Sequence, residues 1–401
     1  MNKLYLLALT LLHSALLHAQ VQHEQLTQGI TIKGTAGYGA NFLNNQQASV
    51  FNTQVLNLNT PIAFKQNNRV GVELNAGVYY TTKLKRNINY IIGVGTTTLI
   101  NAKLSTDAAN ILSYGNYNYQ GKQANLDNSF LQQYSMQYVQ LGIVLHSPDS
   151  ATQLQITGNV LGVKKYTEAN IHYLEMNTTP YFTSIYGQGN YNAIVSDTSA
   201  NANQFAHYSG AGGVLNLDAS STITHSFATK AYYGLRNVGG IKLNKRAISL
   251  NKTGSFLYDG VTINGIADLR DTNLINTTIQ NLKDSLYSLH TGTYSTMLPW
   301  NMYVAFDSKL YKNWNAHYGL NYQYSVGYMP MFFAQVGQNY KHVSWAVVNT
   351  YGGYSGYGLG INASVTTNQF ELYLGVKNLL LLSKNKVNQG VQFGINVPLN
   401  Y

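Results

Sequence analysis

The stretch that decides the fold is Gly390 to Tyr401, GVQFGINVPLNY. Its even positions are glycine, asparagine, glutamine or proline, and every odd position is apolar or aromatic: Val391, Phe393, Ile395, Val397, Leu399 and Tyr401. A period of two residues is that of a β-strand whose two faces meet different surroundings. We therefore predict a strand with its odd residues toward an apolar medium and its even residues toward a polar one.

The same alternation recurs through the chain. It is clear in RVGVELNAGVYY, WNAHYGLNYQYSVG, YGLGINASV, FELYLGVK and MYVAFDSKL, which begin at Arg69, Trp314, Tyr357, Phe370 and Met302. These runs match the ~9 to 11 residues of a tilted strand that crosses a membrane. Short polar connectors such as TTKLKRN, 81–87, join them. This predicts antiparallel neighbours in an up-and-down order.

The composition favours a membrane over water as the surroundings of the apolar face. Charged residues make up 10% of the chain, against about 25% in a typical soluble domain. Soluble β proteins use Lys and Glu to keep their sheets from aggregating. The polar residues here are instead mostly Asn, Gln, Ser, Thr and Gly, which is typical of the inward face of a membrane barrel.

The first twenty residues, MNKLYLLALTLLHSALLHAQ, have a charged start, an apolar run and a small residue before the end. This pattern predicts a cleaved signal peptide over 1–20, followed by a single domain over 21–401. No Cys is present, which excludes disulfides. No later stretch reaches the ~18 to 20 apolar residues of a membrane helix. An exported protein of this kind is either a secreted β protein or a barrel in the outer membrane of a Gram-negative cell.

If the alternating runs are barrel strands, their ionisable residues on the polar face line the lumen. These lumen-facing candidates are Glu73, Asp307, Lys309, His317, Glu371 and Lys377. They either pair with one another to hold the wall or line a solute path. Aromatics at the ends of the runs, on the apolar face, predict a girdle at the membrane interface: Tyr80, Trp314, Tyr357 and Tyr401.

The C-terminal run has a specific role to fill in a barrel. A closed barrel has no free edge, so the last strand must pair with the first. A last strand that ends in an aromatic also resembles the signal that barrel-insertion machinery recognises, and the residues with the matching spacing are Phe393, Gly394, Val397, Leu399 and Tyr401. Pro398 departs from this pattern because it lacks a backbone donor. We expect the last three residues to leave the ladder early.

One segment has helical spacing. In DTNLINTTIQNLKDSLYSLH the apolar residues recur every three to four positions, and Asp271 or Thr272 can cap the start. This predicts an amphipathic helical insert over about 271–289, as the only substantial helix after the signal peptide.

Several stretches resemble a Bacteroidota family of exported proteins of unknown function, identified as outer-membrane β-barrels distantly similar to fatty-acid-transporter and porin-like barrels. The matching segments are SYGNYNYQGKQANL (113–126), GVLNLDASSTIT (213–224), YGLRNVGGIKL (233–243), SFLYDGVTI (255–263), YSTMLPWNMYVAF (294–306) and Phe370 to Leu399. Together they cover most of the mature chain in order. The resemblance implies a barrel with a helical segment before the strand that follows Leu298-Pro299. It carries over no catalytic residue.

Motifs that carry chemistry are absent from the sequence. The ten histidines lack metal-ligand spacing, and the glycine clusters at 210–213 and 351–360 do not lead into a helix, as a nucleotide loop would. His225 with Ser226 is the nearest approach to a hydrolase pair, and a strand residue without a catalytic partner is the better interpretation. We expect no enzyme activity, no cofactor, no metal and no nucleic-acid partner. The net charge of +10 is a scatter of loop lysines with one cluster at Lys83, Lys85 and Arg86.

The sequence thus predicts an all-β, antiparallel, up-and-down transmembrane β-barrel of roughly 14 strands with one inserted helix. The expected partners are outer-membrane lipid and, during biogenesis, the barrel-insertion machinery. The leading hypothesis for function is a channel or transporter for small or hydrophobic solutes. The alternative is a barrel that does not transport and anchors or assists a surface or secretion complex. A helix inside the lumen favours the first, and an apolar helix face outside favours the second.

Overall fold

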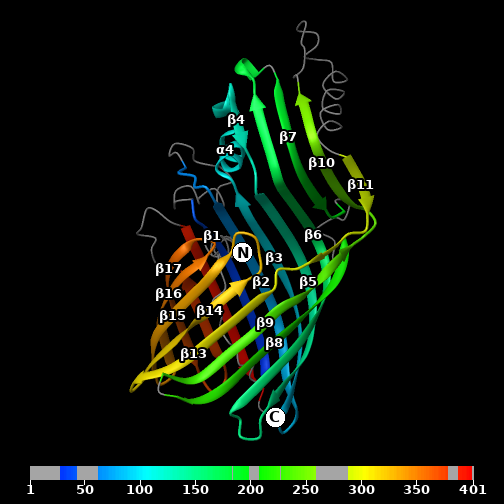
Figure 1. Ribbon diagram of the computed structural model, residues 1–401. Helices are drawn as coiled ribbons and strands as arrows, with labels where there is room; N and C mark the ends of the chain where they lie inside the picture. Colours follow the sequence, from blue (N-terminus) through cyan, green and yellow to red (C-terminus); the bar gives the residue numbers. More distant parts are fainter. Residues whose placement is uncertain are drawn as a thin grey trace, which may run out of the picture.

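The structure is a computed structural model that describes residues 28–42, 62–182, 184–197, 207–225, 227–258, 288–377 and 387–399 (Figure 1). The predicted signal peptide, residues 271–287 of the predicted helix, Ser226 and Tyr401 lie outside the described residues.

The described strands form a closed antiparallel barrel of 14 strands, as predicted. Going around the wall, the strands are β1 (Gly29–Ala40), β2 (Asn68–Lys85), β3 (Ile88–Leu104), β5 (Ser129–His146), β6 (Thr152–Thr178), β8 (Gly210–His225), β9 (Ala228–Leu243), β13 (Asn301–Tyr311), β14 (Trp314–Gln323), β15 (Met329–Tyr340), β16 (Val343–Gly353), β17 (Gly356–Thr366), β18 (Glu371–Lys377) and β19 (Val387–Pro398). Each of them pairs with its two neighbours, and β19 pairs with β1 to close the ring.

The β1–β19 seam is continuous along both strands. The register runs without a shift from Gly29 opposite Pro398 to Ala40 opposite Val387. The expectation that the last three residues leave the ladder concerns 399–401: strand β19 ends before Leu399, whose N–H still donates to the carbonyl of Gln28 at 3.4 Å, and 400–401 lie outside the described residues. Pro398 itself remains paired with Gly29. Gly29 explains why: it has φ +147°, and a Cβ there would lie 2.2 Å from the Val397 carbonyl oxygen. Because glycine allows this approach, the two strand ends stay together despite the proline.

The two faces of the wall differ as the alternation predicted. On β19, the side chains of Phe393 and Val397 point outward and are 45% and 40% exposed, whereas Gln392 points inward and is 5% exposed. The same outward face carries exposed apolar side chains on the other strands, among them Ile32, Val78, Ile92, Val94, Leu141, Leu217, Val304, Phe332, Val347 and Leu374. A surface of this extent is not stable in water, but it matches the apolar band of a membrane barrel. The protein is therefore a membrane-spanning barrel.

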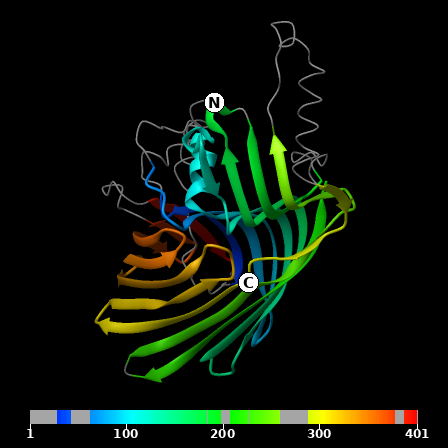
Figure 2. The ribbon, with the colours of Figure 1, turned by 45° about the horizontal axis from the view of Figure 1, so that its top comes forward.

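The two ends of the barrel differ in their connections. Short turns join β2 to β3, β5 to β6, β8 to β9, β13 to β14, β15 to β16 and β17 to β18, and all lie at the end where β1 starts and β19 finishes. At the opposite end β6 continues well past the ring, and its last residues pair with β4 (Lys122–Asn125) and β7 (Ile185–Val195). Together with β10 (Ala247–Tyr258) and β11 (Ser288–Gly292), these strands form a sheet that rises above the barrel (Figures 1 and 2). In membrane barrels the short turns face the periplasm.

A helix that the sequence did not predict lies under this raised sheet. Helix α4 (Thr106–Tyr114) begins at Ser105, whose hydroxyl accepts from the Ala108 N–H. The Asp107 carboxylate accepts from the Tyr119 hydroxyl at 2.8 Å, in the short 3₁₀ turn η1 (Tyr117–Tyr119). Burial and the Asp107 carboxylate raise the pKa of Tyr119 to about 12, so its hydroxyl remains a donor at neutral pH.

Helix α4 shows that the predicted helix over 271–289 is not the only one in the chain, and residues 271–287 of that prediction lie outside the described residues. The last two residues of that range, Ser288 and Leu289, belong to strand β11. A second 3₁₀ turn, η2 (Pro180–Phe182), connects β6 toward β7. Among the described residues, no helix is long and apolar enough to cross a membrane.

The ladder is interrupted beside the lumen where β9 faces β12 (Ser295–Met297) and β13. The ladder to β9 covers Ser295–Met297 and resumes at Asn301. Pro299 lies in the gap and has no N–H to donate, and on the facing strand Asn237 has φ +60°. At this break Leu298 turns inward and joins a buried cluster with Met136, Leu161 and Leu243. Leu298 and Pro299 thus line part of the upper lumen.

The seam generates a direct prediction. Removal of Phe393–Tyr401 deletes half of β19 and leaves the first half of β1, Gly29–Gly34, without its partner on that side. Because unpaired backbone groups are costly in lipid, the truncated protein should fail to insert. Sedimentation after urea extraction of membranes, and the difference in gel mobility between unheated and boiled samples, measure this. Normal insertion of the truncated chain would contradict the role of the seam.

Candidate functional site

The candidate site is the barrel lumen, where the inward residues of neighbouring strands meet at shared levels. The register places Glu73 of β2 beside Leu99 of β3, and His317 of β14 beside Asp307 of β13. The lumen holds two cavities, an upper cavity toward the long connections and a lower cavity toward the short turns. Their volumes are about 310 and 680 Å³.

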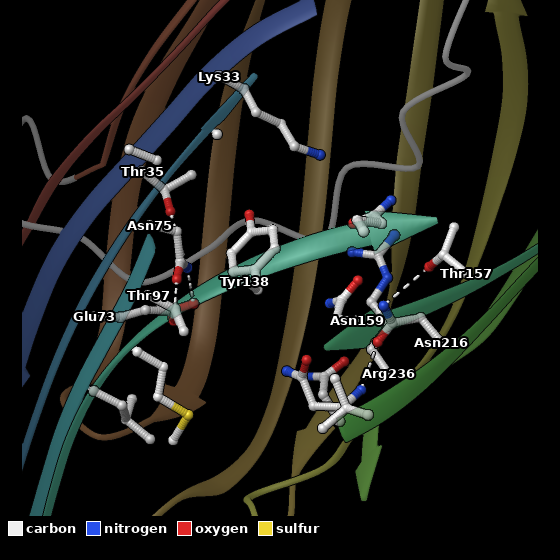
Figure 3. A pocket seen from close by; sticks show the side chains of 18 of the residues that line it. Lys33, Thr35, Glu73, Asn75, Thr97, Tyr138, Thr157, Asn159, Asn216 and Arg236 are labelled. Atoms are coloured by element: carbon white, nitrogen blue, oxygen red, sulfur yellow. Dashed lines mark hydrogen bonds between the residues drawn. The ribbon is translucent and has the colours of Figure 1, made fainter. Parts of the chain in front are cut away.

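The upper cavity is bounded by two polar walls (Figure 3). On the first wall, the amide of Asn75 links three strands: it donates to Thr35 at 3.3 Å and to Glu73 at 2.5 Å, and accepts from Thr97 at 2.5 Å. The hydroxyl oxygens of Tyr79 and Tyr138 lie 2.5 Å apart on the same wall. These bonds fix the side chains in place, so the wall presents a preformed set of donors and acceptors.

Lys33 extends from β1 toward this cavity (Figure 3). Its ammonium nitrogen lies 4.5 Å from the centre of the Tyr79 ring, a distance at which the cation is attracted to the ring face. Together with Glu73, it places one positive and one negative group on the same wall.

The opposite wall carries an ion pair. Asp218 of β8 accepts from the Arg236 Nε of β9 at 2.7 Å and from the Tyr303 hydroxyl of β13 at 2.8 Å. The Asp218 side chain is 5% exposed and that of Arg236 is 35% exposed. Gly234 makes room for this group, since a Cβ there would lie 2.6 Å from the Asp218 carboxylate. The pair therefore ties three neighbouring strands together just below the break in the wall.

One acceptor of this wall has no partner. The amide nitrogen of Asn216 donates to Thr157 at 3.0 Å, and its oxygen accepts from the Asn237 N–H at 2.7 Å. The nearby Asn159 also lines the cavity, but its Oδ1 is buried without a hydrogen-bond partner among the described residues. An unsatisfied buried carbonyl costs about 1–3 kcal/mol. A solute that donates to it would recover that cost.

Apolar and aromatic residues cover the upper cavity on the side of the long connections. Leu99, Tyr134, Met136, Leu161 and Leu298 line the cavity and belong to one buried apolar cluster. The loops after β14 and β16 add Tyr328 and Tyr354, whose rings pack edge to face 5.1 Å apart. We call these residues the roof of the upper cavity.

The lower cavity holds a second group of ionisable residues. Asp307 accepts from the Tyr232 hydroxyl at 2.5 Å, and its other oxygen lies 2.7 Å from His317 Nδ1. The His317 ring lies between the rings of Tyr232 and Phe333, and its Nε2 is buried without a hydrogen-bond partner among the described residues. Lys230 is opposite Asp307 in the register. The remaining lining is mostly Asn, Gln, Ser and Thr.

The six lumen-facing candidates take different places. Glu73 lines the upper cavity, and Asp307, His317 and Glu371 line the lower one. Lys309 is exposed near the short-turn end of β13 and lines neither cavity. Lys377 is the last residue of β18, paired with Gly360 and Gly390, and its side chain lies outside what the structure describes.

Of the residues expected in the closing strand, Phe393 and Val397 point outward, and Gly394 faces the lower cavity. Leu399 follows the last strand residue and Tyr401 lies beyond the described chain. The girdle residues Tyr80, Trp314 and Tyr357 are all at least 36% exposed on the outer face.

Sequence reasoning missed the main charged groups of the upper cavity, Lys33, Asp218 and Arg236. Lys33 could have been predicted from the sequence, because GITIKGTAGYGA alternates and places Lys33 on the other face of the strand from Ile32. Asp218 and Arg236 could not be paired in advance, because the bulge after Leu215 shifts the register between β8 and β9. Within the described residues, no cluster of His, Asp or Glu could hold a metal ion.

A different surface lies on the outside of the barrel. An apolar groove of about 550 Å³ crosses β6, β8, β9, β13 and β14. It is lined mostly by outward side chains: Leu154, Leu217, Tyr233, Leu235, Met302, Val304, Leu320 and Tyr322. Its floor includes Gly234, directly behind the Asp218–Arg236 pair.

No family model and no curated protein matches the chain. Solved structures that resemble it include a TodX deltaS2S3 mutant monoaromatic hydrocarbon channel, with TM-score 0.48 and 7% identity over 93% of this chain and 91% of that one. A Pseudomonas aeruginosa FadL homologue gives 0.45 and 6% over 92% and 89%. The translocator domain of the autotransporter NalP from Neisseria meningitidis gives 0.34 and 10% over 94% and 91%. The resemblance to a Bacteroidota family stays a prediction, and function is inferred below from the residues of this chain.

The ion pair generates a stability prediction. Asp218→Asn removes the charge that pairs with Arg236 but keeps the shape of the side chain. Because the carboxylate is buried and holds two donors, the free energy of unfolding should fall by about 2–4 kcal/mol. Urea titration of the reconstituted barrel, followed by tryptophan fluorescence, measures the change.

The matched control is Arg246→Ala. Arg246 lies 3.9 Å from Asp197 and its side chain is 73% exposed, so its loss should cost only about 0–1 kcal/mol. Equal effects of the two substitutions would contradict the structural role of the Asp218–Arg236 pair.

Proposed function

We propose that the protein is an outer-membrane transport barrel whose lumen takes small polar solutes. The observation that carries this proposal is the upper cavity. It is enclosed by fixed hydroxyl, amide and charged groups, and it keeps one buried acceptor, Asn159 Oδ1, without a partner. A site that is rich in placed polar groups binds solutes that replace the hydrogen bonds of water.

The charges of the cavity narrow the class of solute. The positive groups Lys33 and Arg236 are balanced by Glu73 and Asp218 on the same walls. A cavity with balanced charge gives no long-range preference for anions or cations. The solutes that fit best are therefore small, neutral or zwitterionic molecules with several hydrogen-bonding groups. Of the small or hydrophobic solutes expected from the sequence, the polar walls of the upper cavity favour the small polar ones.

The test measures uptake by proteoliposomes. Asn159→Leu removes the unpartnered acceptor and fills part of the cavity with apolar atoms. The rate of liposome swelling with small neutral polyols or amino acids should fall about 3- to 10-fold, the equivalent of about one hydrogen bond. Swelling that is absent for the unaltered protein would overturn the proposal.

The matched control is Val160→Leu, one residue along the same strand. Val160 faces the membrane and is 69% exposed, so this substitution should leave swelling unchanged. A loss of equal size in both variants would mean that strand β6, and not the cavity, sets the rate.

The outer groove favours a second candidate, the uptake of hydrophobic solutes from the membrane. TodX is named as a monoaromatic hydrocarbon channel. Val304→Trp would fill the groove without touching the lumen. If hydrophobic solutes use it, this variant should lower the uptake of a monoaromatic hydrocarbon and leave polyol swelling unchanged. The alternative of a barrel that anchors a complex stays a prediction, because residues 271–287 lie outside the described chain.

A further inference from the structure

One residue lines both lumen cavities. The upper and lower cavities have separate linings except for Tyr373 of β18. On the adjacent strand β19, Gln392 lines the upper cavity, and Gly394 lines the lower one. Tyr373 is directly opposite Gly394 in the register, and Gly375 is opposite Gln392. The tyrosine therefore lies at the level where one cavity gives way to the other.

A chain of side-chain amides fixes this ring from one side. The Gln392 amide nitrogen donates to the Tyr373 hydroxyl and lies 3.5 Å from the Asn362 oxygen. The Asn362 amide in turn donates to Gln335 at 3.0 Å. Asn362 and Gln392 are only 6% and 5% exposed. The amides thus run from β15 across β17 to β19 and end on the tyrosine.

The chain of amides depends on a missing side chain. It passes over Gly375, where an added Cβ would lie 2.6 Å from both the Asn362 oxygen and the Gln392 nitrogen. Any other residue at this position would push the two amides apart.

On the other side of the ring there is room to move. A Cβ built on Gly394 would have only the Ile32 carbonyl oxygen within 4 Å, at 3.8 Å. The surface opposite Tyr373 is therefore open, in contrast to the crowded surface over Gly375. A tyrosine that leaves Gln392 has space to turn toward the lower cavity, and an aromatic side chain has few other rotamers.

From this arrangement we propose that Tyr373 is the residue that selects solutes by size between the two cavities. Its ring separates the upper from the lower cavity while Gln392 holds its hydroxyl, and it turns over Gly394 to let a solute pass. This inference rests on the proposed function for its biological meaning, because Tyr373 would be the barrier on the path that solutes take through the lumen. The separation itself is a physical property that is measured without transport.

The experiment uses the absence of cysteine from the chain. Thr35→Cys places a single thiol in the upper cavity, and Ser364→Cys places one in the lower cavity. Each is made with and without Tyr373→Ala, and the folded barrel is treated with a charged methanethiosulfonate reagent. Ser364→Cys should react at the same rate in both backgrounds. Thr35→Cys should react slowly with Tyr373 present and about tenfold faster without it, because the reagent must pass the level of the ring.

Two further variants sharpen the result. Tyr373→Phe keeps the ring but removes the hydroxyl that Gln392 holds, so the reaction of Thr35→Cys should take an intermediate rate. Tyr357→Ala removes a tyrosine that faces the membrane from the adjacent strand β17 and should change neither thiol. Heat-dependent gel mobility establishes that every variant is folded.

The outcomes separate the two proposals. Equal labelling of Thr35→Cys with and without Tyr373 would overturn the barrier, and an unchanged rate in Tyr373→Phe would overturn the role of the Gln392 hydrogen bond. If labelling depends on Tyr373 but liposomes take up no solute, the barrier stands and the proposed transport function fails. If both hold, Tyr373→Ala should admit larger polyols than the unaltered barrel does.

Discussion

The backbone hydrogen bond between the first and last strands is the interaction on which the rest of the structure depends. In a bilayer an unpaired N–H or C=O group has no water to bind, so a sheet that crosses it must close on itself. Here closure requires that β19 lie against β1 along its whole length, from Gly29 opposite Pro398 to Ala40 opposite Val387. Once the ring is closed, each residue has only two directions to face, lipid or lumen.

That division explains the composition of the lumen and the narrowness of the path through it. Inward positions face a polar lumen, so they are occupied mainly by residues such as Asn, Gln, Thr and Tyr, many of which hydrogen-bond to neighbours on adjacent strands. Some of the ionisable groups lie in hydrogen-bonded pairs, such as Asp218 with Arg236 at 2.7 Å and Asp307 with His317 at 2.7 Å. Such pairs tie strands together, and they also leave two separate cavities with Tyr373 between them. The wall and the proposed solute path are thus made by the same residues.

The alternation of residues was enough to predict the strands, their antiparallel order and the outward face of β19, whereas the barrel also needed the low charge content and the neutral polar residues of the other face. The alternation was also enough to place Glu73 and His317 on the inward face, because a period of two fixes the side of the sheet. Three features were out of reach for physical reasons. Helix α4 is only nine residues long and is held by Ser105 and Asp107 more than by its own periodicity. The break at Pro299 changes whether odd or even residues point inward. A bulge such as the one after Leu215 shifts the register against the neighbouring strand, and the local sequence pattern does not reveal it. Two contacts depend on the register between strands: Asp218 with Arg236, and Gln392 with Tyr373. The sequence of one strand alone does not determine that register.

The central claim is that the outer face of the wall contacts lipid and the inner face contacts water. A spin-label scan of β19 tests it most directly. Because the chain has no cysteine, single labels can be placed one at a time from Gly390 to Leu399 in the reconstituted barrel. The account predicts that labels at odd positions collide with oxygen dissolved in the lipid, that labels at even positions do not, and that the difference repeats with a period of two residues. Labels that meet a water-soluble relaxation agent equally at odd and even positions, or that show no alternation, would contradict it.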